Sequence, residues 1–208
     1  EAKTYNTPDV NFIWSMTSGP KKSILCATGE PGAVLSIKDG KHEAIFSSEE
    51  SHIRSIRYDT KLGIFAGGGE KGILYRQKPG DQQFRALFDS GHTEITSIVL
   101  QNDMAYTASV TGAEALIKEH QKSSSGKGSD SSSASIKVRS QLVRVDMNGA
   151  SEVLAGSNDE IIFGLAINSQ NDLTVATGAT GRDNPRGRIY TIEPKTRRIA
   201  MVYQAEAK

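Results

Sequence analysis

Acidic side chains gather in three short polar segments of the sequence, and carboxylates are versatile groups for chemistry. The segments cover residues 47–52, 89–94 and 157–160, and the acidic residues of interest in them are Glu49, Glu50, Glu94, Asp159 and Glu160. Carboxylate oxygens are preferred ligands of Ca²⁺, which needs six or more oxygens, and a carboxylate can also act as a general base. Charged loops that keep a surface soluble are the simpler explanation. A site for Ca²⁺ or for general-base chemistry would require the fold to bring these segments together.

A glycine pattern has the spacing of a dinucleotide-binding fingerprint. It consists of Gly67, Gly69 and Gly72, with Asp89 further along the chain. The fingerprint requires a helix after the glycines to hold the pyrophosphate, whereas the residues after Gly72 have the pattern of a strand. We therefore predict a β-turn at these glycines and no nucleotide cofactor.

The histidines and the single cysteine give no metal-binding pattern. No pair among His42, His52, His92, His120 and Cys26 has a spacing typical of zinc ligands. Cys26 lies in an apolar run, which predicts a buried thiol rather than a nucleophile. The sequence therefore predicts no metal site, no cofactor and no catalytic constellation.

Composition narrows the class of protein. The 208 residues carry 25 basic and 24 acidic side chains, a formal net charge of +1, and the basic residues are scattered. Such a distribution argues against a nucleic-acid partner, and no apolar run approaches the roughly 20 residues of a membrane helix. The composition does not indicate a cellular compartment. The first residue is Glu1 rather than methionine, which is compatible with a removed signal peptide, so export or a periplasmic location is favoured over the cytoplasm.

An internal repeat indicates the fold that must position these groups. Four segments begin alike, at Ile13, Ile53, Ile95 and Ile162, so their starts lie 40, 42 and 67 residues apart. The last interval contains a serine-rich stretch, without which the period returns to about 42 residues, as in four-stranded propeller blades.

Each repeat divides into four short strands separated by turn residues, and helical periodicity is absent. Asp39-Gly40, Pro79-Gly80 and Asn148-Gly149 mark tight turns between the third and fourth strands. We predict an all-β fold, a β-propeller with four antiparallel four-stranded blades. The predicted blades cover 12–52, 53–94, 95–160 and 161–208, after an N-terminal extension over 1–11 and with a flexible serine-rich insertion over 118–140.

The repeated unit resembles the blades of a poorly characterised group of bacterial propeller proteins, related in architecture to WD-repeat and lactonase-type propellers. The resemblance is carried by ATGEPGAVLSI at 27–37, GEKGILY at 69–75, ATGATG at 176–181 and GRIYTI at 187–192. The third blade departs from it, because residues 107–110 replace the glycine turn. The resemblance implies the fold and no particular activity. Four blades with uncapped ends predict part of a larger ring, or a ring completed by self-association.

Two groups of residues are candidates for binding a ligand or a partner. The residue after each leading isoleucine differs, being Trp14, Arg54, Thr96 or Phe163. At the start of the innermost strands these side chains are placed to face the channel mouth and bind a small polar ligand, although packing between blades is the simpler role. The second group is Arg182, Asp183, Asn184 and Arg186, in an insertion on the same face as the serine-rich one. If the protein has a ligand or a protein partner, we expect these residues to contact it; drift in exposed hairpins is the simpler explanation of the insertions.

Two function classes follow. A non-enzymatic scaffold for protein or ligand binding is favoured, because the repeats differ mainly in their loops and no catalytic constellation is visible. The alternative is a propeller enzyme, such as a calcium-dependent lactonase or hydrolase, that uses the loop carboxylates.

Overall fold

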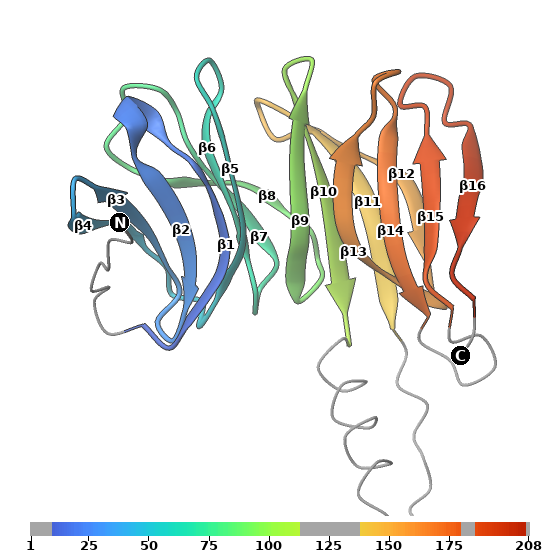
Figure 1. Ribbon diagram of the computed structural model, residues 1–208, viewed down its shortest axis with the longest axis horizontal. Helices are drawn as coiled ribbons and strands as arrows, with labels where there is room; N and C mark the ends of the chain where they lie inside the picture. The colour runs from blue at the N-terminus through green and yellow to red at the C-terminus, as the bar shows by residue number, and fades with distance from the viewer. Residues whose placement is uncertain (1–9, 113–137, 180–185, 207–208) are drawn as a thin grey trace, which may run out of the picture.

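The computed structural model describes residues 10–112, 138–179 and 186–206, and in these residues every sheet is a four-stranded antiparallel meander (Figure 1). The first sheet has β1 (Phe12–Ser18), β2 (Ile24–Gly29), β3 (Ala33–Lys38) and β4 (Lys41–Ser47). The second has β5 (Ile53–Asp59), β6 (Gly63–Gly68), β7 (Ile73–Gln77) and β8 (Arg85–Asp89). The third has β9 (Glu94–Gln101), β10 (Met104–Thr111), β11 (Arg139–Asp146) and β12 (Ser151–Ser157). The fourth has β13 (Glu160–Ile167), β14 (Leu173–Ala179), β15 (Arg188–Ile192) and β16 (Ile199–Gln204). We call these sheets blades 1 to 4, and the predicted all-β fold is confirmed.

Helix is confined, within the described residues, to one 3-10 turn at Pro20–Lys22 (η1). No helix there is long and apolar enough to cross a bilayer. The hairpin chemistry is as predicted: Asp39 and Gly40 both have positive φ, 49° and 78°, in the turn between β3 and β4. The glycines at 67, 69 and 72 end β6 and lead into β7, so they form the predicted turn and precede no helix.

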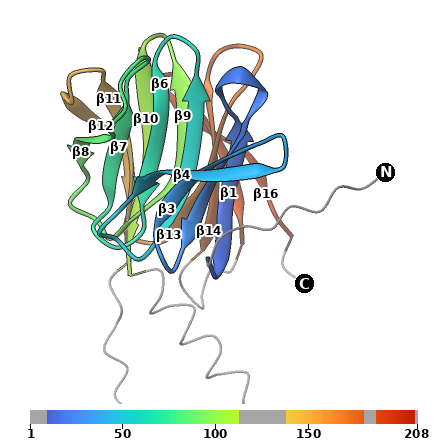
Figure 2. The same cartoon turned by 90° about the vertical axis from the view of Figure 1, so that its left-hand side faces the viewer.

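The blades lie in chain order, and their first strands are neighbours: β1 contacts β5, β5 contacts β9, and β9 contacts β13. Figure 1 shows blade 1 and blade 4 at opposite ends of this row, and Figure 2 shows β3 and β4 of blade 1 in front of the other sheets. The described residues thus form an arc of four blades.

The hydrophobic core is divided among the three junctions between blades. At the first junction Leu25 and Val34 of blade 1 pack on Ile53 and Ile56 of blade 2. Corresponding clusters join blade 2 to blade 3 and blade 3 to blade 4. This arrangement explains why many strands are apolar on both faces, since each central sheet is covered by a neighbour on either side.

Both insertions interrupt the connection from the second to the third strand of a blade. β10 ends at Thr111 and β14 at Ala179, on the face that also carries the connections from blade to blade. The serine-rich insertion was predicted over 118–140, but β11 begins at Arg139, so its last two residues belong to a strand that pairs with β10 and β12. The rest of that insertion up to residue 137, and Arg182, Asp183 and Asn184, lie outside the described residues.

Cys26 provides a test of the first blade's packing. Its side chain is buried, with 3% of its surface exposed, and burial raises the pKa of the thiol. Because only an accessible thiolate reacts quickly, we expect labelling by a disulfide reagent at pH 8 to be at least about tenfold slower in the native protein than in urea. Equal rates in the two conditions would show that blade 1 does not protect this thiol.

Candidate functional site

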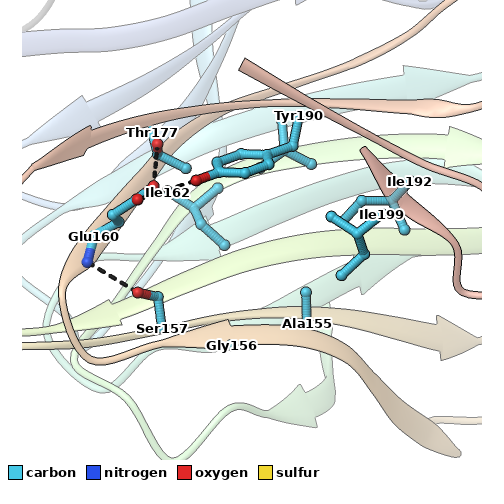
Figure 3. A pocket seen from close by; sticks show the side chains of 10 residues that line it. Ala155, Gly156, Ser157, Glu160, Ile162, Thr177, Tyr190, Ile192 and Ile199 are labelled. Carbon is cyan, nitrogen blue, oxygen red and sulfur yellow. Dashed lines mark hydrogen bonds between the residues drawn. The ribbon is translucent and has the colours of Figure 1, made fainter. Parts of the chain in front are cut away.

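A pocket of about 220 Å³ lies between blades 3 and 4 (Figure 3). One wall comes from β12, and the other comes from the four strands of blade 4. Its lining is formed by Ala155, Gly156, Ser157, Glu160, Ile162, Val175, Thr177, Tyr190, Ile192 and Ile199. Figure 3 shows the polar groups of Glu160, Thr177 and Tyr190 at one end, with Ile162 beside them, and Ile192 and Ile199 at the other end.

The polar end of the pocket is a closed network around Glu160. The Thr177 hydroxyl donates to one carboxylate oxygen at 2.5 Å, and the Tyr190 hydroxyl donates to the other at 3.1 Å. Arg188 forms an ion pair with the same carboxylate and also donates to Gln204. Only 8% of Glu160 is exposed, and this burial is tolerated because its oxygens are bonded.

The surroundings in this network raise the pKa values of Arg188 and Tyr190. Hydrogen bonding to Tyr190 and to Glu160 raises the pKa of the Arg188 guanidinium. Desolvation is the main cause that raises the pKa of Tyr190. The network therefore keeps a charged arginine and a neutral phenol at neutral pH.

A second buried carboxylate, Glu50, has the corresponding role in blade 2. Its carboxylate accepts from the backbone N–H groups of Glu70 and Lys71, at 2.9 and 2.8 Å, and from the Tyr75 hydroxyl at 2.9 Å. Burial is also the main cause that raises the pKa of Tyr75 to about 12. In both blades, an acid at the start of the blade binds a tyrosine in the third strand.

These contacts show where two of the five acidic side chains named from the sequence lie. Glu50 and Glu160 point into their blades. Their carboxylates accept hydrogen bonds there from donors in or between the second and third strands. Glu94 forms an ion pair with Arg54, and Glu49 pairs with Lys71 at the surface. Among the described residues, no three His, Cys, Asp or Glu side chains form a group that could hold a metal ion.

Trp14, Arg54, Thr96 and Phe163 share one structural feature: each is the extra residue of a β-bulge in the first strand of its blade. A bulge redirects its side chain, and here three of the four make contacts with the next blade. The Arg54 guanidinium lies 3.9 Å from the centre of the Trp14 ring, and the Thr96 hydroxyl donates to the Ile162 carbonyl at 2.7 Å. Phe163 lies over Gly178 and is 54% exposed.

The pocket residues were missed by the sequence reasoning, apart from Glu160, and only a weak signal was available for them. That signal is an acid just before the first strand in blade 2, or at its first residue in blade 4, followed by a tyrosine in the third strand. The tyrosine lies 25 residues on in blade 2 and 30 in blade 4. Of the residues predicted around the shorter insertion, the structure describes Arg186, which is exposed two residues before Arg188.

Comparisons with known proteins agree on the architecture. No family model and no curated protein matches the sequence. Among solved structures, a chain of a nidogen–laminin complex is similar with a TM-score of 0.65 and 15% identity, over 91% of this chain and 64% of that one. A gluconolactonase of Xanthomonas campestris gives 0.57 and 13%, over 89% and 58%. The computationally designed protein Ika4 gives 0.55 and 11%, over 91% and 96%.

The chain thus spans less than two thirds of the length of the two natural structures named here, and the identities are low. At this level of identity, structural likeness establishes the fold and leaves activity open. The four sheets of the described residues are blades of a β-propeller.

Proposed function

We propose that this chain is a non-enzymatic β-propeller scaffold for protein binding, and that the pocket between blades 3 and 4 receives one apolar side chain of the partner. One observation carries the proposal: the polar groups of the pocket bind one another, so the remaining surface offered to a partner is apolar. Ile162, Val175 and Ile192 form its buried part, and Ile199 stands half-exposed at its border.

The size of the pocket favours a side chain over a free metabolite. Sites that enclose a small molecule usually measure roughly 300–1,000 Å³, whereas this pocket measures about 220 Å³. Its position also suits a protein partner, because Arg188 of the Glu160 network follows closely on the exposed Arg186. In this proposal Arg186 contributes to a polar rim around an apolar anchor, and Arg182, Asp183 and Asn184 stay predicted partner contacts.

A calcium-dependent lactonase or hydrolase is the other class, and one structural neighbour is a gluconolactonase. Two of the carboxylates that such an enzyme would need, Glu50 and Glu160, are engaged inside the blades. Binding is therefore the better supported of the two functions.

Filling the pocket should abolish partner recognition without unfolding the protein. Peptides selected from a random displayed library on the purified chain are expected to lose at least about tenfold in affinity for Ala155→Phe, because the new ring occupies the space of the anchor. Val153→Phe on the same strand is the matched control: Val153 is exposed and lies outside the pocket lining.

Two outcomes would count against the proposal. Peptides that bind wild type and Ala155→Phe equally would place recognition elsewhere. Turnover of gluconolactone in calcium chloride, above the uncatalysed rate, would support the enzyme class instead.

A further inference from the structure

The outer faces of blades 1 and 4 repeat residue types that are buried in the interior of the arc. Ile53, Ile95 and Ile162 lie just before the bulge in the first strands of blades 2 to 4 and are 0%, 0% and 4% exposed. The residue at the same place in blade 1, Ile13, is 51% exposed. Met16 is 69% exposed where Ile56 and Ile98 are fully buried, because no blade precedes blade 1 among the described residues.

The trailing face of blade 4, at the opposite end of the arc, is exposed in the same way. Phe46 pairs with Val34 on blade 1, and both pack into the junction with blade 2. The corresponding pair on blade 4 is Tyr203 and Ile189, and Tyr203 is 57% exposed. Within the part of the chain that the structure describes, blade 1 therefore lacks a cover on its leading face, and blade 4 lacks one on its trailing face.

A contact rule describes how one blade meets the next near the bulges. At the first two junctions the bulge residue contacts the side chain two residues before the bulge of the following blade, whereas at the third junction Thr96 donates to the Ile162 carbonyl. Trp14 donates to His52 at 3.3 Å, and Arg54 forms an ion pair with Glu94 at 3.4 Å. Applied to blade 4, the rule places Phe163 against the residue two before Trp14, which is Phe12.

Phe163 and Phe12 are themselves complementary. Phe163 is 54% exposed and Phe12 is 42% exposed, with the Phe12 ring stacked on Trp14. An aromatic pair is a favourable substitute for the ion pair and the hydrogen bond at the first two junctions. The two faces do not meet within one chain, because blades 1 and 4 stand at opposite ends of the row (Figure 1).

We propose that a second copy of this chain covers both faces, so that two copies form an eight-bladed ring. The trailing face of blade 4 in one copy packs on the leading face of blade 1 in the other, and the two junctions are related by a two-fold axis. Eight blades lie within the usual range of closed propellers. This inference concerns assembly and does not depend on the pocket between blades 3 and 4.

Sedimentation velocity and light scattering on the purified 208-residue chain test the assembly. We expect a species of twice the 22.4 kDa chain mass. Phe163→Arg and Phe12→Glu should each weaken the dimer by roughly 30-fold or more, the loss typical of a hot-spot residue. Val153→Arg, which changes an exposed apolar residue of blade 3 outside both faces, should leave the dimer intact.

Combining the two substitutions provides the sharper test. The double variant Phe163→Arg/Phe12→Glu recreates the arrangement of Arg54 and Glu94 at the new junction, so dimerisation should recover in part and become sensitive to salt. A folded monomer for the wild-type chain would overturn the proposal, as would a ladder of larger species, because an open filament leaves its end faces uncovered. Single variants that dimerise like wild type would also overturn it.

Discussion

Replacing Glu50 with alanine is expected to lower the free energy of unfolding by about 3 kcal/mol or more. The carboxylate is 1% exposed and satisfies two backbone N–H groups as well as the Tyr75 hydroxyl. Alanine leaves these donors buried without an acceptor, which costs more than the bonds themselves contribute. Urea denaturation followed by circular dichroism measures the change.

The neighbouring residue supplies a matched control for this prediction. Glu49 has the same side chain, but 92% of it is exposed and its partner Lys71 lies 3.4 Å away at the surface. Glu49→Ala should change stability by no more than about 0.5 kcal/mol. Similar losses for the two variants would mean that Glu50 acts through general charge and not through its buried hydrogen bonds.

The second large effect is expected from Gly63→Ala. Gly63 has φ +98°, and a Cβ built there would overlap the Gln77 carbonyl oxygen across the β6–β7 ladder. Because backbone strain and overlap add, we expect a loss of about 3 kcal/mol, measured as a lower thermal midpoint and urea midpoint.

Gly80→Ala separates the two causes. Gly80 also has positive φ, +85°, but nothing lies within 4 Å of its Cβ position. Only the backbone term remains, so the loss should be about 1 kcal/mol. Equal losses in the two variants would show that the β6–β7 ladder adjusts to the methyl group.

The architecture could be predicted from the sequence because it depends on short local features that recur along the chain. One leading isoleucine, such as Ile53, occurs near the start of each blade. Hairpin turns such as Asp39-Gly40 depend on two adjacent residues only. Trp14 and Arg54 were also identified as special, since they vary at a fixed position of the repeat. That position turns out to be the bulge, which a period-two pattern does not reveal.

The pocket and the buried acids could not be predicted in the same way. Whether Glu50 faces solvent or the blade interior depends on Tyr75, which lies two strands later and whose orientation follows from sheet register. Glu49 and Glu50 are adjacent and chemically identical, yet they have opposite environments. The insertion boundary failed for a related reason: Arg139 and Ser140 are polar, but their strand is stabilised by pairing with β10 and β12.

The division of the core into three junctions has a consequence for how the molecule comes apart. Counting the described residues alone, blades 2 and 3 are each held by two apolar interfaces, whereas blades 1 and 4 are each held by one. In such a linear array, stability is approximately a sum of nearest-neighbour couplings. Cooperativity is therefore weakest at the two ends, so an isolated chain frays from blades 1 and 4 inward, and closing the ring removes those ends and makes unfolding a single event.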